Sequence, residues 1–275
     1  MLMIADLHAL TSLRDPQALR QSTTDIVKDY ITSGVDPKKA ILFRQSDVLE
    51  HTELAWIFEC LVTMPFLMQA HAYKDKVAKG MEANAGLFNY PMLMAADILM
   101  YDTEVVPVGE DQRQHVEYAR EAVTKFNNAY GETFIAPQER VLAGVGIVPG
   151  TDGQKMSKSY KNTIPLFGTT EEIKKAVMGI VTDSSGNRPE NVYAIHKLFH
   201  AEAELEALYE EHKGKYKDLK EALAADIDAF IAPMRERRAS ITNADVETVL
   251  KDGAVRARER ASKKMAEVRK AVGLA

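Results

Sequence analysis

Residues 1–43 alternate between apolar runs and a helical pattern, and this order constrains the fold more than any other feature of the chain. Met1-Leu2-Met3-Ile4 is a short apolar run followed by polar residues, as expected of a buried strand that ends in a site. Asp15-Pro16 predicts the start of a helix, because proline suits the first helical turn, and Gly34 predicts its end. Ala40-Ile41-Leu42-Phe43 predicts the next strand. A strand, a helix and a strand in this order predict a right-handed parallel crossover and an α/β core.

Helical patterns dominate the rest of the chain. Residues 51–66 predict a helix, Pro91 predicts the start of a very apolar one, and a polar helix is expected to end near Phe126, after a short strand at 105–108. Residues 144–153 contain four glycines and predict a flexible loop. After Phe167 strand signals become rare. We therefore expect a first domain over 1–165, a helical domain over 166–255, and a basic helix over 256–275 that packs back on the first domain.

Composition sets wide limits on function. Hydrophobic residues make up 46% and charged residues 27%, which is ordinary for a water-soluble globular protein. The single cysteine, Cys60, cannot build a disulfide framework and suits a reducing cytoplasm. The net charge of −5 does not point to nucleic acid, although eight Lys or Arg against three acids follow position 250. That basic end fits a solvated helix as well as it fits RNA contact.

The pentapeptide Lys155-Met156-Ser157-Lys158-Ser159 follows the glycine-bearing loop. Two lysines three residues apart on a loop suit a triphosphate, because ammonium groups can strengthen their contacts as pyrophosphate leaves. An exposed polar turn is the plainer interpretation. A given pentamer arises by chance in only about one in ten thousand chains of this length, so we favour the phosphate-handling function.

Asp97 is a lone carboxylate on the apolar helix that follows Pro91. A buried charge costs several kcal/mol unless a partner satisfies it. From the pattern alone, an exposed position or an ion pair is as good an explanation as a ligand contact.

The pentapeptide is the second signature of class I aminoacyl-tRNA synthetases, and other segments make the resemblance more specific. The chain resembles bacterial tryptophanyl-tRNA synthetases over nearly its whole length, in the segments Ile4–Thr11, His51–Trp56, Gly86–Pro91, Asp97–Leu99 and Val106–Gln112. The resemblance implies a Rossmann-like, parallel-sheet nucleotide-binding domain with a helical C-terminal domain. It implies a tryptophan–tRNA ligase that uses ATP and Mg²⁺ to form tryptophanyl-adenylate and then transfers tryptophan to tRNA(Trp).

Site residues follow from the resemblance. Asp97 is placed to accept the N–H of an indole, which offers one donor and no acceptor. Its expected neighbours in a tryptophan pocket are His8, Tyr90, Met94, Val106, Val108 and Gln112, although plain core packing also explains the apolar ones. ATP contacts are expected from a wider set: Lys76, Gly109, Glu110, Asp111, Val148, Lys155, Met156, Ser157, Lys158 and Ser159. Lys155 and Lys158 are also the expected catalytic pair. For Lys76, an ordinary surface charge is an equally serious explanation. We assign no metal-ligating residue.

A first class I signature of the His-x-Gly-His or His-Leu-Gly-Asn type is not found at any of the seven histidines. In the family it precedes the stretch that corresponds to Met1-Leu2-Met3-Ile4. The chain is therefore expected to lack the first strand and helix of the nucleotide fold and to be weakly active or inactive in tryptophan activation.

Two alternatives stay open beside the ligase. One is a tyrosyl-tRNA synthetase of the same architecture, and the other is a non-catalytic module that binds tryptophan or RNA. The resemblance also implies a homodimer in the cytoplasm without a membrane partner, and a helical domain that reads the anticodon, with Arg235, Arg237 and Arg238 as its basic cluster.

Overall fold

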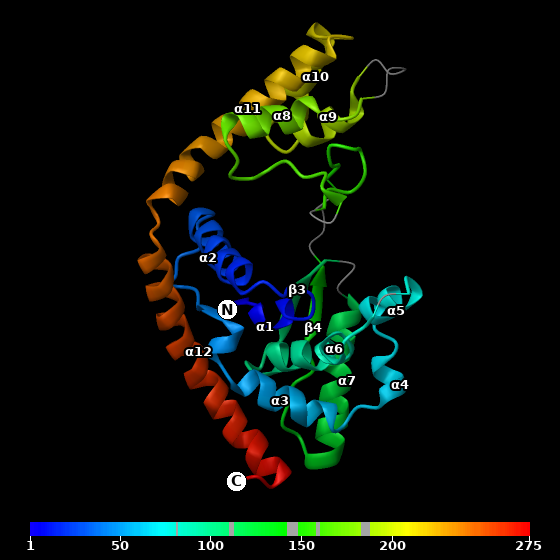
Figure 1. The fold of residues 1–275 in the computed structure, drawn as a ribbon, viewed down its shortest axis with the longest axis vertical. Coiled ribbons are helices and arrows are strands. Elements are labelled where there is room, and N and C mark those ends of the chain that lie inside the picture. Colours follow the sequence, from blue (N-terminus) through cyan, green and yellow to red (C-terminus); the bar gives the residue numbers. More distant parts are fainter. Residues whose placement is uncertain (81, 110–112, 142–147, 158–159, 183–187) are drawn as a thin grey trace. The chain divides into compact units, whose positions relative to one another are not determined.

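The computed structural model describes residues 1–80, 82–109, 113–141, 148–157, 160–182 and 188–275 (Figure 1). These residues form two compact units, one comprising Met1–Ala143 with Ile241–Ala275 and the other Gly144–Ser240. The boundaries between the units lie at 143/144 and 240/241, whereas the expected domain boundaries were near 165 and 255. The Lys155–Ser159 segment belongs to the second unit, and residues 241–255 belong to the first.

The predicted β-α-β start is confirmed. Strands β1 (Leu2–Ile4) and β2 (Leu42–Arg44) pair in parallel, with Leu2 opposite Leu42. Helix α2 (Pro16–Thr32) connects them, and the Asp15 carboxylate caps it by accepting the N–H groups of Gln17 and Ala18 at 2.8 and 3.2 Å.

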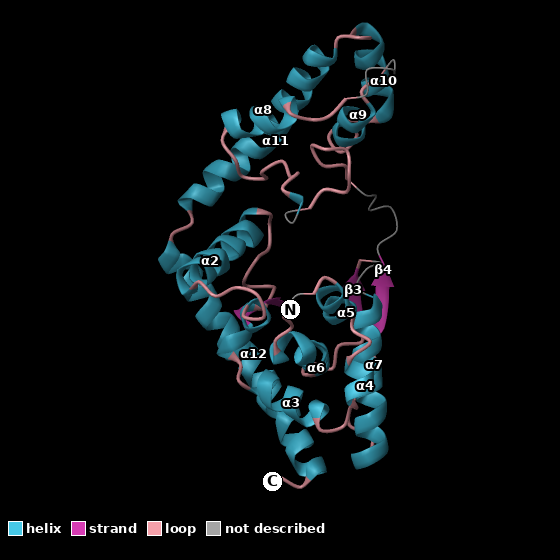
Figure 2. Ribbon diagram, turned by 45° about the vertical axis from the view of Figure 1, so that its right-hand side comes forward, coloured by secondary structure: helices cyan, strands magenta, loops and turns pink. Residues whose placement is uncertain are grey.

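A second parallel pair is formed by β3 (Val105–Val108) and β4 (Gln138–Val141), joined through α7 (Arg113–Tyr130) (Figure 2). Strand β3 was predicted, but β4 was not. Its sequence, Gln-Glu-Arg-Val, has neither an apolar run nor apolar alternation, so the backbone pairing with β3 and the contact with α7 define it as a strand.

The core of the first unit is helical and aromatic. Phe58, Phe126 and Phe134 pack edge to face on one another beside buried Leu54 and Met92. The remaining elements of this unit are the helices α1 (Asp6–Ala9), α3 (Glu50–Glu59), α4 (Met64–Leu67), α5 (His71–Ala78), α6 (Ala85–Leu99) and α12 (Asn243–Val272) and the 3-10 turn η1 (Gln45–Asp47).

Two helix predictions were wrong in their bounds. The helix expected over 51–66 is divided into α3 and α4, because Pro65 has no N–H and occupies the first turn of a new helix. Pro91 does not open a helix but lies inside α6, which begins at Ala85. Asn84 sets that start, since its side chain accepts the N–H of Leu87 at 2.9 Å.

Helix α12 closes the first unit by packing directly on β2. A Cβ atom at Gly253 would lie 1.9 Å from the carbonyl oxygen of Leu42, so only glycine allows this approach. Beyond it, Ala257, Ala261 and Met265 are fully buried in the aromatic core. The end of the chain therefore packs against the first unit.

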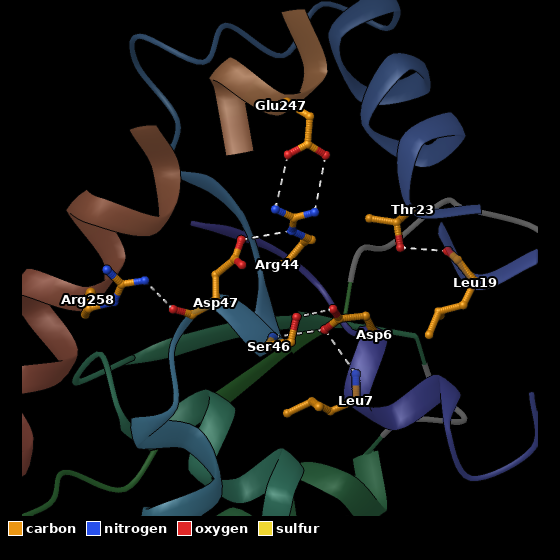
Figure 3. A network of polar contacts seen from close by, with 9 residues as sticks. All are labelled: Asp6, Leu7, Leu19, Thr23, Arg44, Ser46, Asp47, Glu247 and Arg258. Carbon is orange, nitrogen blue, oxygen red and sulfur yellow. Dashed lines mark hydrogen bonds and ion pairs between the residues drawn. The ribbon is translucent and has the colours of Figure 1, made fainter. Parts of the chain in front are cut away.

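Charged side chains reinforce this packing (Figure 3). Arg44 at the end of β2 donates to Asp47 at 2.9 Å and reaches both carboxylate oxygens of Glu247 on α12. Arg258 donates to the backbone oxygen of Asp47 at 2.7 Å. The turn that follows β2 is thus fixed from two positions on α12.

The second unit is built from α8 (Thr170–Met178), α9 (Glu190–His196), α10 (Glu202–Glu211) and α11 (Tyr216–Ser240). Its core joins Ile173 and Val177 of α8 to Ile227 and Ile231 of α11, with Val192 of α9. Within the described ranges, no helix has both the length and the apolar character needed to cross a membrane.

Candidate active site

The carboxyl ends of β1 and β2 lie at the same edge of their sheet, because the strands are parallel. The chain continues from β1 into α1, which holds His8, and from β2 into η1, which begins at Gln45. Both side chains meet Asp97 of α6. His8 Nε2 lies 2.8 Å from Asp97 Oδ2, and Gln45 Nε2 donates to Oδ1 and Oδ2 at 2.8 and 3.0 Å.

A second histidine completes the surroundings of this carboxylate. His51 Nδ1 lies 2.7 Å from Asp97 Oδ1, and His51 Nε2 lies 2.8 Å from the Tyr101 hydroxyl. Only 8% of the Asp97 side chain is exposed. Burial opposes its ionisation, but the hydrogen bonds and charge of His51 and His8 outweigh it and lower the pKa of the Asp97 carboxyl. Asp97 is therefore a buried anion with nitrogen donors at both oxygens.

A pocket of about 480 Å³ opens beside Asp97. One stripe of α6 forms a wall of it, since Tyr90, Met94 and Asp97 recur at helical spacing. Tyr90 bonds His115 through its hydroxyl at 2.8 Å, and burial raises the pKa of that hydroxyl. The lining residues are Met3, Ala5, His8, Thr11, Leu87, Tyr90, Met94, Asp97 and His115, and they all belong to the first unit.

The other predicted tryptophan contacts are placed differently. Val106 and Val108 alternate onto the same side of β3 and are half-buried, but neither is among the described residues that line this pocket. Gly109 follows directly after β3. Glu110, Asp111 and Gln112 lie outside the described residues.

The lysine-bearing segment forms a short turn in the second unit. Pro149 and Lys155 form an antiparallel bridge, and the N–H of Met156 donates to the oxygen of Val148 at 2.9 Å. Val148 packs against the core formed by α8, α9 and α11. The core of the second unit thereby supports Lys155, whereas Lys158 and Ser159 lie outside the described residues. Lys76, the other lysine assigned to ATP, is half-buried on α5.

Asn162 organises this turn. Its Oδ1 accepts the N–H of Ser157 at 2.8 Å, while its Nδ2 donates to Asp152 Oδ1 at 2.7 Å and to the Lys155 carbonyl at 3.1 Å. The hydrogen bond from Asn162 lowers the pKa of Asp152. Asn162 itself is almost fully buried, and a Cβ on Gly150 would lie 2.3 Å from its amide nitrogen. One side chain therefore holds the backbone from the Lys155 carbonyl to the Ser157 N–H and ties it to the Asp152 carboxylate.

Sequence reasoning missed four of these residues: Gln45, His51, His115 and Asn162. Gln45 had a usable signal, because it directly follows a strand whose carboxyl end meets that of β1. His51 and His115 act through partners some 50 and 25 positions away in sequence. Nothing local distinguishes them from ordinary core or surface histidines.

The arginines expected to contact RNA already have structural partners in the second unit. Arg235 donates to Asp228 at 2.6 Å, and the Arg238 guanidinium lies 5.5 Å from the centre of the Phe167 ring. Arg237 lies in the last turn of α11.

Comparisons with known proteins agree with this architecture. The family model described as tRNA synthetases class I (W and Y) matches residues 1–241. A tryptophan–tRNA ligase from Rhodopirellula baltica is 44% identical over 286 residues, which cover 98% of this chain and 88% of that protein. One from Fusobacterium nucleatum is also 44% identical, and covers 98% of this chain and 87% of its own length.

Solved structures give the same result. Tryptophanyl-tRNA synthetase from Campylobacter jejuni, complexed with ADP and tryptophan, has a TM-score of 0.92 and 41% identity, and covers 99% of this chain and 89% of that one. The Mycoplasma pneumoniae enzyme has a TM-score of 0.84 at 29% identity, with 99% and 88% covered. These matches confirm the Rossmann-like α/β class with a helical second part. The chain belongs to the class I tRNA synthetase family of the tryptophan and tyrosine enzymes.

Proposed function

We propose that the chain is a tryptophan–tRNA ligase, which activates tryptophan with MgATP to tryptophanyl-adenylate and transfers it to tRNA(Trp). The observation on which the proposal chiefly rests is the buried Asp97 carboxylate beside an apolar pocket. The names of the relatives support the same substrate, since they are tryptophan–tRNA ligases at 39–44% identity.

The chemistry of the pocket suits an indole. Met94 and Leu87 offer apolar contact to a planar ring, and Tyr90 adds an aromatic edge. Asp97 can only accept hydrogen bonds while ionised, which matches the single N–H donor of the indole. His8 is one-fifth exposed and lines the pocket, so it is the donor that can move aside when the ligand takes its place on Asp97.

Activation requires that a carboxylate oxygen of tryptophan attack the α-phosphorus of ATP. The bond from that phosphorus to the bridging oxygen breaks, and pyrophosphate leaves with the electron pair. Lys155 and Lys158 would neutralise the charge that grows on pyrophosphate, which stabilises the transition state. Gly109, Glu110 and Asp111 would contact the ribose, Val148 the adenine, and Met156, Ser157, Ser159 and Lys76 the phosphates.

Mg²⁺ is proposed to enter with ATP as part of the substrate. Asp152 is the carboxylate that shares hydrogen bonds with the Lys155 turn. Its Oδ1 already accepts from the Asn162 side chain and from the N–H of Gln154, so we do not assign it to the metal ion. Phosphate oxygens and water are the ligands that Mg²⁺ prefers when a protein provides no cage. The protein's part is then to hold the phosphates.

The second unit is proposed to contact tRNA. Arg237 and Arg238 lie in the last turn of α11, and a basic helix end suits a phosphate backbone.

A homodimer is also proposed, with the cytoplasm as its location. The homodimer would cover large apolar side chains that are exposed on and around α3 and α4, namely Leu49, Trp56, Met64 and Met68. Light scattering coupled to gel filtration would measure the dimer directly.

The test is ATP–pyrophosphate exchange on the full chain with tryptophan or tyrosine. Only weak exchange is expected, because the first class I signature is not found in the sequence, but it should depend on tryptophan. Exchange with tyrosine should be weaker by at least about a further hundredfold. Preference for tyrosine would contradict the assignment. If calorimetry shows that the chain binds tryptophan but no exchange is detected, the chain is a non-catalytic binding module and not a ligase.

A further inference from the structure

A cluster of two histidines and one aspartate lies in the second unit, among residues that the proposed function does not use. His196 ends α9, His200 lies in the turn before α10, and Asp226 lies on α11. His196 Nε2 is 2.6 Å and His200 Nε2 is 2.9 Å from the same atom, Asp226 Oδ2. Three potential ligand atoms from three segments therefore converge on one point.

The far side of each ring also has a partner. His196 Nδ1 lies 3.2 Å from the Tyr209 hydroxyl, and His200 Nδ1 lies 3.5 Å from Glu204 Oε2. A partner at Nδ1 orients an imidazole and directs Nε2 toward the metal, and such outer partners accompany most histidine ligands. The Tyr209 hydroxyl can either donate to Nδ1 or accept from Nδ1–H.

Hydrogen bonding alone is the simpler explanation of this geometry. In that state each Nε2–H donates to Asp226, and Tyr209 donates to His196 Nδ1. A metal ion would take the place of those two protons, and each ring would change tautomer. The side chain of His196 is fully buried, so neighbouring side chains hold its ring in place.

The dimensions fit a tetrahedral ion. The ligand atoms of the three residues lie within 4.8 Å of one another. Metal–ligand bonds of about 2.0–2.2 Å at tetrahedral angles place neighbouring ligand atoms roughly 3.3–3.5 Å apart. The separations of 2.6 and 2.9 Å at Asp226 Oδ2 must widen by about 0.4–0.9 Å to reach this spacing. His200 and Asp226 can move that far because 37% and 34% of their side chains are exposed. The same exposure leaves a fourth position for water.

Two imidazoles and a carboxylate favour zinc over the common hard cations. Mg²⁺ and Ca²⁺ prefer shells made of oxygen, whereas Zn²⁺ takes nitrogen and oxygen ligands together. The turn that follows α9 brings His200 back beside His196. We propose that His196, His200 and Asp226 form a Zn²⁺ site, with water as the fourth ligand and with Tyr209 and Glu204 orienting the rings.

The ion would join the α9–α10 turn to α11. Its expected effect is stability of the second unit, because a ligand that binds only the folded state raises the unfolding free energy. The proposal stands apart from the ligase assignment, since the residues that carry it are not among those assigned to tryptophan or ATP.

The test is metal binding to the untagged full chain after chelator treatment and gel filtration. Titration with Co²⁺ should give the visible absorption of a tetrahedral site at one equivalent per chain, and Zn²⁺ should displace it. Zn²⁺ should also raise the melting temperature. His200→Ala and Asp226→Asn should each weaken binding by at least about tenfold and abolish that rise.

His212→Ala is the matched control, because it removes another partly buried histidine of the same unit and should leave binding intact. Circular dichroism on each variant separates loss of the site from loss of the fold. No stoichiometric Co²⁺ or Zn²⁺ binding at tens of micromolar metal would overturn the proposal. Binding that survives both His200→Ala and Asp226→Asn would do so as well.

Discussion

His8 Nε2 lies 2.8 Å from Asp97 Oδ2, on the carboxylate that we assign to the indole of tryptophan. Gln45 and His51 approach the same carboxylate from behind, and both are fully buried. Of these three groups only His8 lines the pocket. An entering N–H donor therefore has to take the place of His8, while Gln45 and His51 keep Asp97 ionised and in position.

Replacing Asp97 by asparagine tests this geometry. Asp97→Asn removes the charged acceptor, and a hydrogen bond to a charged group contributes about 1.5–3 kcal/mol. Tryptophan should therefore bind about ten- to a hundredfold more weakly in calorimetry. An analogue with sulfur in place of the indole N–H is the matched control, since the variant should lose little further affinity for it. Equal loss for both ligands would show that Asp97 acts on the pocket rather than on the N–H.

The lowered pKa of Asp97 predicts how stability depends on pH. A carboxyl whose folded pKa lies below its unfolded value of 3.8 contributes stability that is complete above that value. The contribution is lost as the pH falls from 3.8 through the folded pKa. Urea unfolding of wild type and Asp97→Asn should show a constant difference from neutral pH to about pH 4 and a shrinking one below it. A difference that grows on acidification would contradict the prediction.

Gly253 gives a prediction about the fold alone. Alanine usually stabilises an exposed helix position relative to glycine by about 1 kcal/mol. At Gly253 the added Cβ would meet the Leu42 carbonyl at 1.9 Å, so α12 would have to move off β2. Gly253→Ala should lower the unfolding free energy by about 1–3 kcal/mol. The control is Lys251→Ala, an exposed position on the same helix that should change it by less than about 0.5 kcal/mol.

The order of elements could be predicted where local signals agree. The apolar runs at β1 and β2 and the Asp15-Pro16 start of α2 all follow from short-range pattern. The pattern failed at β4, whose polar sequence becomes a strand through its partner β3, and at the start of α6. There the Asn84 cap outweighed the usual position of proline. The strand that pairs with a segment and the residue that caps a helix decide these two elements. The spacing of apolar residues along the chain carries no information about either partner.

The site residues also fall into those expected before the structure and those that only the structure shows. The resemblance supplied His8, Tyr90, Met94 and Asp97, and the last three share one face of α6. Gln45 and His51 reach Asp97 across some 50 positions of sequence. Their role depends on how the two strand ends and α3 meet α6. Only the folded chain shows why a charge at Asp97 is tolerated.

Asn162 provides the last test, of the turn that holds Lys155. Asn162→Ala removes the acceptor for the Ser157 N–H and the donors to Asp152 and the Lys155 carbonyl. Displacement of a catalytic group by about 1 Å can cost roughly a hundredfold in rate. We expect kcat for ATP–pyrophosphate exchange to fall by about ten- to a hundredfold. Affinity for tryptophan should stay unchanged, because all the described residues that line its pocket belong to the first unit.

Asn162→Asp sharpens this test. It keeps the acceptor for Ser157 but places a second carboxylate against Asp152, so exchange should fall at least as far as in Asn162→Ala. Thr170→Ala is the control, since it removes a hydrogen bond to Asp228 at the surface of the same unit and should leave kcat within about twofold. Unchanged kcat in both Asn162 variants, with folding verified by circular dichroism, would show that the position of Lys155 does not depend on Asn162. A parallel rise in the tryptophan dissociation constant would show instead that the two units are coupled through this turn.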